Sequence, residues 1–391
     1  MNYANNTDSH IYYDISVFNN DTMGSMPVNL SFSETRSGGA LVENPSEYLF
    51  SIVRFELDSP TLPVFIAEPV SGSVNSLIYT FVIETVDNEN NPVNVYKQQV
   101  QFVPSNNNIT LPDPDTNLSS DYYFVYNYHR FIYMVNTALA ALFAAIPMIE
   151  RAGVAAAPYF TYDPKTGLNT LYTTQEYETT NNPSPKKLNL YWNAPTETLF
   201  SGFDTTVITD AESIRLDGGG VAGSHLNKYY KLNVNNYYNN NITYIKTGEL
   251  TSMAYITMVQ NYASFAMCSP IQNIVFTTSG NLPISNAQTA APVIYSSSGE
   301  CLTQGAASDI SPILTDFIVP LITGTEYKPK INYNPSVYRL IDLKGNSPIK
   351  SVDLQVYWKS KIDSKLHPLV LGSQCGATCK IMFRKKAFDN L

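Results

Sequence analysis

Apolar and polar residues alternate with a period of two along much of this chain, and this period constrains the fold more than any other feature. A period of two places every second side chain on one face of an extended strand, whereas a helix needs a period near 3.6. The alternation is clearest at 11–18, 48–57, 188–193, 351–358 and 377–384. Each stretch therefore predicts a strand with one core face and one wetter face.

Other stretches depart from this alternation. Residues 76–86 are apolar on both faces, which is typical of a strand covered on each side. Residues 121–126 predict a further strand, which is followed by a long helix at 127–151, and residues 196–200 predict a helix of one turn. The stretch 131–149 has no charged residue, so a membrane span has to be considered. Its alanine-rich sequence, its proline and its place in the middle of a β protein favour a packed helix without membrane insertion.

Turn signals rich in Asn, Asp and Pro separate the predicted strands, for example at 87–92, 112–115 and 181–185. Many strands, one inserted helix and long polar loops together predict an all-β protein. The expected fold is an antiparallel jelly-roll β-sandwich with an inserted helix-containing subdomain.

We expect three segments along the chain. Residues 1–120 form N-terminal jelly-roll strands, residues 121–248 form the inserted subdomain with its helix, and residues 249–391 complete the sandwich. The strands after residue 311 should pair with the earliest strands, as Greek-key connections require. The stretch 280–308 is rich in small residues and predicts a long surface loop.

The composition points to extensive contacts with other subunits. Charged residues make up only 15% of the chain, against about 25% in an ordinary soluble domain. The chain also contains 28 Tyr, a residue enriched at protein–protein interfaces. The Tyr- and Asn-rich segments 229–244 and 172–183 are candidates for subunit contacts or for an exposed crown. Simple solvent-exposed loops and the codon bias of an AT-rich genome are the alternative explanations.

Charge is distributed unevenly. The net charge is −9, but residues 328–391 contain 12 basic and 4 acidic residues, so the first 327 residues carry −17. Such asymmetry predicts that basic residues near one end face a polyanion or an acidic neighbour. Solvation of an exposed sheet face is the alternative. The candidate residues are Lys359, Lys361, Lys365, Arg384, Lys385 and Lys386.

The sequence contains no recognisable catalytic, cofactor or metal motif. The glycine-rich stretch 216–223 lacks the Gly-Lys-Ser/Thr ending of a phosphate loop. The four His residues are scattered, and no His lies near Cys375 and Cys379 in the sequence to complete a zinc site. We therefore predict no catalytic residue, no cofactor and no metal site, and a protein that is not an enzyme.

Two regions resemble a known group of proteins. Residues 44–66, NPSEYLFSIVRFELDSPTLPVFI, resemble a segment of minor capsid proteins from small eukaryotic DNA viruses. The second region is a series of short C-terminal motifs: ISPILTDF at 310–317, YNP at 333–335, YRLIDL at 338–343, VDLQVYWK at 352–359, LHPL at 366–369 and KIMFR at 380–384. Their order is similar to the end of penton-type proteins of the virophage and Polinton-like group.

This resemblance implies a jelly-roll subunit that forms homopentamers at the vertices of an icosahedral capsid. Its implied partners are further copies of itself, the major capsid protein of the same virus and packaged nucleic acid at the inner face. The implied location is the virion, assembled in the host cytoplasm or nucleus. The Arg-Gly-Asp tripeptide of some penton bases is absent from this sequence, so receptor binding is not implied.

Other functions remain open at this stage. The first is the principal jelly-roll capsid subunit of a small RNA or single-stranded DNA virus. Such subunits often carry a basic arm, whereas residues 1–35 contain no Lys or Arg. The second is a β-sandwich glycan-binding adhesin, which the polar start of the sequence disfavours because it lacks a secretory signal. The third is an enzyme without a recognisable motif.

Overall fold

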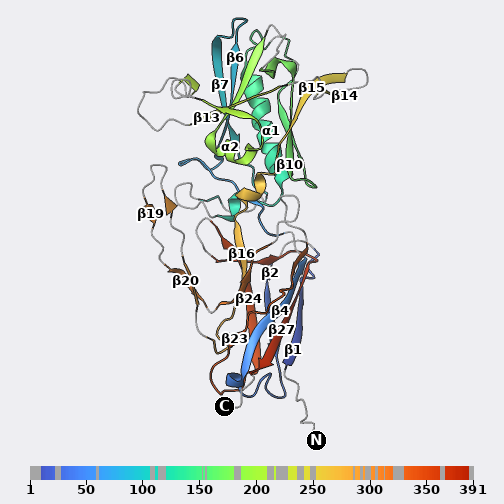
Figure 1. The fold of residues 1–391 in the computed structure, drawn as a ribbon, viewed down its shortest axis with the longest axis vertical. Coiled ribbons are helices and arrows are strands. Elements are labelled where there is room, and N and C mark those ends of the chain that lie inside the picture. The colour runs from blue at the N-terminus through green and yellow to red at the C-terminus, as the bar shows by residue number, and fades with distance from the viewer. Residues whose placement is uncertain are drawn as a thin grey trace. The chain divides into compact units, whose positions relative to one another are not determined.

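The chain folds into two compact units (Figure 1). The first unit consists of Met1–Leu62, Pro270–Leu321 and Tyr327–Leu391, and the second consists of Pro63–Ser269 and Ile322–Glu326. A computed structural model describes residues 10–22, 28–58, 61–105, 111–112, 120–151, 153–154, 156–179, 186–208, 215–216, 228–235, 242–246, 252–284, 287–290, 294–295, 301–303, 307–311, 313–319, 330–361 and 366–386.

In its described residues, the first unit is made of strands and one 3-10 turn. In chain order its elements are β1 (His10–Phe18), β2 (Val28–Asn29), β3 (Ser31–Thr35), η1 (Pro45–Glu47), β4 (Tyr48–Asp58), β16 (Ile271–Thr277), β17 (Ala287–Ala290), β18 (Ile294–Tyr295), β19 (Cys301–Thr303), β20 (Ala307–Ser311), β21 (Ile313–Phe317), β22 (Lys330–Tyr333), β23 (Ile341–Asp342), β24 (Ser351–Ser360), β25 (Leu366–Pro368), β26 (Val370–Leu371) and β27 (Gly376–Lys385).

Two antiparallel sheets of this unit pack face to face. One has the order β1-β27-β4-β22, with β23 also paired to β4, and the other has the order β21-β16-β24-β25, with β3 also paired to β24. Phe55 of β4 joins them, because its ring lies 5.0 Å from that of Phe276 on β16 and 5.9 Å from that of Phe317 on β21. The predicted jelly-roll sandwich is confirmed, and so is the pairing of late strands with early ones.

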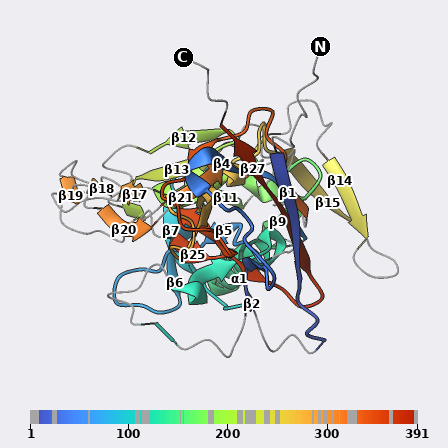
Figure 2. The same cartoon turned by 90° about the horizontal axis from the view of Figure 1, so that it is seen from below.

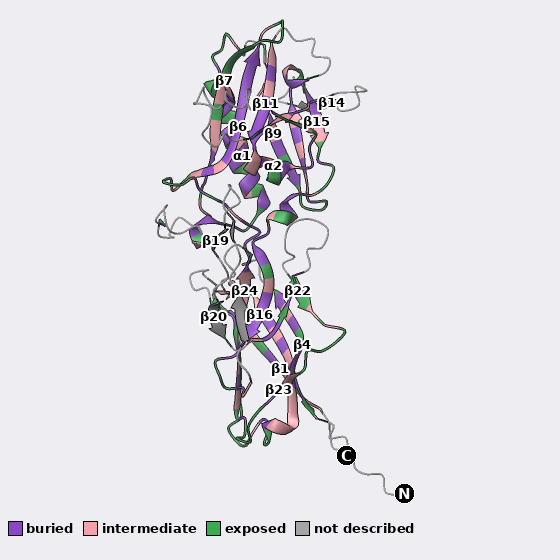
Figure 3. Cartoon of the chain, turned by 60° about the vertical axis from the view of Figure 1, so that its left-hand side comes forward, coloured by how far each residue is buried: buried purple, intermediate pink, exposed green. Residues whose placement is uncertain are grey.

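The predicted alternation is visible in the burial of single strands. Along β24, residues alternate between half-buried and buried, with Val352, Leu354 and Val356 facing the core. In the second unit, β6 and β11 are buried along most of their length (Figure 3). This agrees with the expectation for 76–86, because a strand covered on both faces has no polar alternation.

The second unit combines strands with helices, among them α1 and α2. Its elements are β5 (Phe65–Ile66), β6 (Ser76–Val86), β7 (Pro92–Gln101), η2 (Asp121–Tyr123), β8 (Phe124–Val125), α1 (Tyr128–Ala145), β9 (Tyr159–Asp163), β10 (Leu168–Thr173), η3 (Gln175–Tyr177), β11 (Lys187–Asn193), α2 (Ala194–Phe200), β12 (Thr205–Val207), β13 (Tyr229–Leu232), β14 (Ile242–Lys246), β15 (Ser252–Val259) and η4 (Phe265–Cys268). Its sheets have the orders β12-β13-β11-β6-β7 and β14-β15-β10-β9.

Helix α1 begins where its sequence predicts, but it ends at Ala145, six residues before the predicted end at Arg151. The side chain of Asn127 accepts a hydrogen bond from the backbone N–H of His129 at 2.7 Å, which caps the first turn. The helix ends at Ala145 because Pro147 disfavours helical geometry in the residue before it. One side of α1 is buried in the second unit, through residues such as Phe131 and Leu139. The expectation of a packed helix is therefore confirmed.

The boundaries of the units differ from the predicted segments. The second unit begins at Pro63, and the predicted boundaries at residues 121 and 248 both fall inside it. The reason is the pairing of β6 with β11, which places an early strand in the sheet of the second unit. Strand alternation reports which face is buried, but it does not report which strand is the neighbour.

Two local predictions also differ from the structure. Residues 121–126 were expected to form a strand, but they form the 3-10 turn η2 and the two-residue strand β8, because the Ser120 side chain caps the turn by accepting from Tyr122 N. The stretch 280–308 was expected to be a loop, but it contains the short strands β17, β18 and β19 and the start of β20, which pair as hairpins.

Candidate functional site

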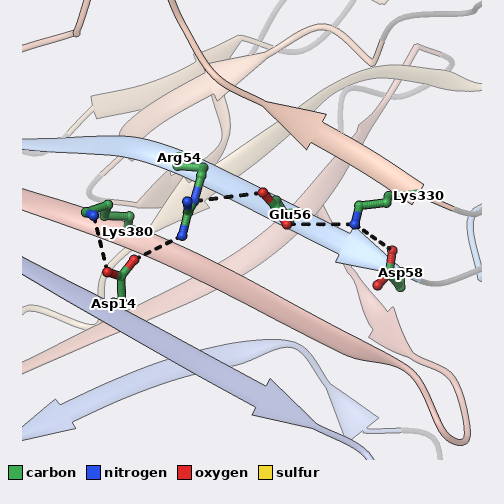
Figure 4. A network of polar contacts seen from close by, with 6 residues as sticks. All are labelled: Asp14, Arg54, Glu56, Asp58, Lys330 and Lys380. Atoms are coloured by element: carbon green, nitrogen blue, oxygen red, sulfur yellow. Dashed lines mark hydrogen bonds and ion pairs between the residues drawn. The ribbon is translucent and has the colours of Figure 1, made fainter.

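The outer face of the sheet β1-β27-β4-β22 carries a row of alternating charges (Figure 4). The register of the strands produces this row, because Asp14 lies opposite Lys380 and Lys380 lies opposite Arg54. We call it the charge row, and its members are Asp14, Lys380, Arg54, Glu56, Lys330 and Asp58.

Ion pairs connect the charge row across four strands. Asp14 accepts from both Lys380 and Arg54 at 3.2 Å. Arg54 lies 3.9 Å from Glu56, and Lys330 bridges Glu56 at 3.8 Å to Asp58 at 4.0 Å. These side chains are a third to more than half exposed, so each pair stabilises the fold only slightly. The three basic and three acidic side chains of the charge row pair with one another, so the row carries no net charge.

Asp14→Asn should have a small effect that depends on salt. We expect the free energy of unfolding to fall by about 0.5 kcal/mol at low ionic strength and by less at high salt, because solvent screens exposed ion pairs. Glu43→Gln is the matched control, since Glu43 is exposed and has no ion pair among the described residues. Urea unfolding at two salt concentrations measures both. A loss that is the same at both salts would contradict the ionic origin.

The structure separates the predicted basic residues into two groups on different sheets. Lys359 is half-buried near the end of β24, and Lys361 is exposed just after it, where its backbone N–H donates to Pro270 O at 2.8 Å. Lys365 lies outside the described residues. Arg384 is exposed near the end of β27, in the other sheet, where it pairs with Leu49 of β4. The described members therefore do not form one basic cluster.

Two of the predicted residues already have acidic neighbours within the chain. Lys385 Nζ lies 3.8 Å from Glu47, and Lys386 Nζ lies 3.1 Å from Asp342 and donates to Ser46 O at 2.7 Å. These pairs reduce the repulsion that an uncompensated basic cluster would create. Lys359, Lys361 and Arg384 have no ion pair within the described part of the chain.

The described residues show no arrangement suited to metal or thiol chemistry. Within these ranges, no group of three or more His, Cys, Asp or Glu could hold a metal ion. Cys375 and Cys379 are free thiols, and burial raises the pKa of Cys379 well above its usual range. A thiol with a raised pKa is a poor nucleophile at neutral pH.

None of the helices in the described part of the chain is long and apolar enough to cross a membrane.

The predicted Tyr-rich contact segments contribute to the core instead of an exposed crown where they are described. Tyr229 on β13 is fully buried, and Tyr177 in η3 is 1% exposed. Tyr172 on β10 stacks on Tyr159 of β9 at 4.9 Å. Tyr supplies apolar area for a core as readily as for an interface, so its abundance alone could not distinguish the two. Residues 180–185 and 236–241 lie outside the described residues.

A surface that sequence reasoning missed lies on α1. The charge-free stretch 131–149 was interpreted only as a packed helix, but its other side is exposed. Tyr133 is 68% exposed, and Met148 and Ile149, just after the helix, are 80% and 78% exposed. The sequence does contain a signal for this exposed surface, which is the absence of charge on every face of the helix. An isolated surface helix carries charged residues on its solvent side.

Comparison with known proteins identifies the family. The family described as Sputnik minor capsid protein V18/19 matches residues 11–385 of this chain. The chain belongs to this family. The match spans most of both units, so it is not confined to the two regions of resemblance in the sequence.

Two relatives of the V18/19 family come from the Sputnik virophage. The chain is 34% identical over 161 residues to the uncharacterized protein V18, which covers 38% of this chain and 90% of V18. It is 28% identical over 156 residues to the structural protein V19, which covers 40% of this chain and 65% of V19.

Solved structures show the same fold over nearly the whole chain. A chain in the 3.5 Å structure of the Sputnik virophage matches with a TM-score of 0.74 and 25% identity, covering 98% of this chain and 99% of that one. The mavirus penton protein matches with a TM-score of 0.60 and 15% identity, covering 96% and 99%, and this likeness shows the fold alone. The V18/19 chain is thus a structural minor capsid protein of the virion, which confirms the structural function predicted from the sequence.

Proposed function

We propose that five copies of this V18/19 chain form a ring that closes each vertex of an icosahedral capsid. The observation that carries the proposal is the shared fold with the mavirus penton protein over 96% of this chain. Membership of a minor capsid family supports it, because vertex proteins are present in fewer copies than face-forming proteins. Identical head-to-tail contacts close into a ring only when their rotation fits the number of copies. The partners at the rim of the ring are major capsid subunits.

Copy number tests the proposal. Twelve vertices with five copies each give about 60 copies per particle, far fewer than a protein that forms the faces of a large shell. Isotope-labelled standard peptides and mass spectrometry of purified particles measure this number. We expect about 60 copies. A chain that outnumbers every other virion protein would contradict the vertex function and support the principal capsid subunit instead.

We also propose that Lys359, Lys361 and Arg384 face the shell interior or a neighbouring subunit, together with Lys365. The first three have no acidic partner within the described residues, so an external anion would stabilise them. Packaged nucleic acid or carboxylates of the major capsid protein could supply it, during assembly in the host cytoplasm or nucleus. A reconstruction of the particle that places these side chains on the outer surface would exclude this proposal.

A further inference from the structure

Helix α1 presents an uncharged outer face. We call this the α1 face and define it by its exposed residues Tyr133, Thr137, Ala141, Ala144, Met148 and Ile149. No Asp, Glu, Lys or Arg lies between Arg130 and Glu150, so the face contains no charge. Three of its members are large apolar side chains that are at least 68% exposed. A patch of this kind marks an interaction surface on a soluble unit.

Polar contacts hold the helix in place against two sheet edges. The Asn136 side chain exchanges two hydrogen bonds of 2.8 Å with the backbone of Phe160 on β9. Glu150, five residues beyond the end of α1, accepts from Asn94 at 2.8 Å and from Tyr96 at 2.9 Å, both on β7. Since β7 and β9 are the last strands of their sheets, α1 covers one side of the unit. The α1 face is therefore fixed before any partner binds, which lowers the entropy cost of association.

The side of the second unit away from α1 contains a hollow. It has a volume of about 330 Å³ and is lined by residues near β12 and β13 and by the end of β15, including Phe203, Thr257 and Val259. Strands β12, β13 and β15 lie at or next to one end of their sheets, whereas β7 and β9 lie at the other end. Figure 2 shows β12 and α1 on opposite margins. Val259 is 53% exposed. The charged residue in the lining, Asp204, is bonded to Asn233 at 3.1 Å.

We infer that the α1 face of one copy docks into the hollow of the next copy. This inference rests on the proposed ring and names its contact. A ring needs two different faces on each copy, and the second unit offers a projecting face and a hollow on separate sides. Residues 250–299, which include the β15 part of the hollow, contain no charged residue. Apart from Asp204, whose carboxylate accepts a hydrogen bond from Asn233, both surfaces are apolar or neutral where they would meet.

The charge of the second unit favours another copy as the occupant. By sequence, this unit contains 18 Asp and Glu against 10 Lys and Arg, a net charge of −8. Two identical acidic units repel each other unless their contact faces carry no charge. A surface that binds a basic partner would instead carry carboxylates, and the α1 face has none. A charge-free face on an acidic unit is therefore the expected contact for a like-charged neighbour.

The size of the face fits the core of an interface. An 18-residue helix is about 27 Å long and about 10 Å wide. One side of it has a footprint of about 300 Å², against about 800 Å² per partner in a stable interface. The α1 face would form the apolar centre, and polar residues around it would form the rim, as in other interfaces.

The test places a single carboxylate on either surface. Ala141→Glu changes the centre of the α1 face, and Val259→Glu changes the hollow. We expect each variant to weaken association by at least about 100-fold, because the contact would bury an unpaired charge. Ser71→Glu is the control, since Ser71 is an exposed turn residue outside both surfaces. Ala141→Ser controls for the change of side chain without adding charge.

Native mass spectrometry and sedimentation of the purified full chain measure the number of copies, and thermal unfolding checks that each variant is folded. Ala144→Glu tests the same face should Ala141→Glu unfold. Pentamers of the wild type and controls, with monomers of the Glu variants, are the expected result. Pentamers of either folded Glu variant would overturn the inference and leave the proposed ring intact. A monomeric wild type would overturn the ring and the inference together.

Discussion

Replacing Phe55 by alanine should lower the free energy of unfolding of the first unit by about 3 to 5 kcal/mol. Phe55 is fully buried between the two sheets of the jelly roll. Its ring lies within 6.2 Å of the rings of Phe32, Phe276 and Phe317, which come from three strands of the facing sheet. Truncation therefore removes contacts on several sides at once and leaves a cavity that close-packed aromatic rings cannot fill.

The measurement has to distinguish the two units. Hydrogen exchange followed by mass spectrometry in increasing urea does so, because peptides from β4 report on the first unit and peptides from β6 on the second. Val337→Ala is the control, since Val337 is 81% exposed and its truncation should change the free energy by less than about 0.5 kcal/mol. Equal losses in both variants would mean that Phe55 does not hold the sheets together.

Much of the jelly roll could be predicted because its strands carry their burial pattern locally. The stretch 377–384 was predicted from alternation, and β27 occupies Gly376–Lys385 with alternate residues facing the core. The pairing partners were harder to predict. Strand β27 lies between β1 and β4, which are over 300 residues away along the chain. Only the general rule of Greek-key topology indicated that late strands pair with early ones.

The boundary of the second unit shows where local patterns fail. The stretch 76–86 was correctly predicted as a strand covered on both faces, but it was placed in the jelly roll. Its neighbour is β11, with Phe81 opposite Trp192 and Val86 opposite Lys187. Apolar residues on both faces fit the centre of either sheet equally well. The choice depends on long-range packing, including the contact of Phe81 with Phe200 on α2.

The candidate surfaces were predicted less well than the fold because they too depend on residues that lie far apart in the sequence. Charge counting found the basic C-terminal region but not its partners, and Lys386 lies 3.1 Å from Asp342, 44 residues earlier in the chain. The α1 face was missed because a charge-free helix was assigned to the core as a whole. A stretch without charge can be buried inside its own chain or under a neighbouring copy, and the sequence alone does not distinguish the two.

Asn136→Leu should detach α1 from β9 and lower the free energy of unfolding of the second unit by about 2 to 3 kcal/mol. The Asn136 side chain takes the place of a neighbouring strand at the edge of β9, because its amide N–H donates to Phe160 O and its oxygen accepts from Phe160 N. Phe160 is 1% exposed, so leucine would leave both backbone groups without a partner and away from water. A leucine of similar size keeps the helix, since its helix propensity exceeds that of asparagine.

Exchange of the Phe160 amide hydrogen gives the most direct measurement of this effect. We expect it to exchange about 30 to 150 times faster in Asn136→Leu than in the wild type, which corresponds to the predicted loss of free energy. Thr137→Ala is the matched control, because Thr137 is the exposed neighbour and donates only to Tyr133 O of its own helix. An unchanged exchange rate at Phe160 in Asn136→Leu would show that α1 is held by Glu150 and its apolar side alone. Because the ring is proposed to use the α1 face, loosening the helix should also weaken pentamers, even though Asn136 lies outside that face.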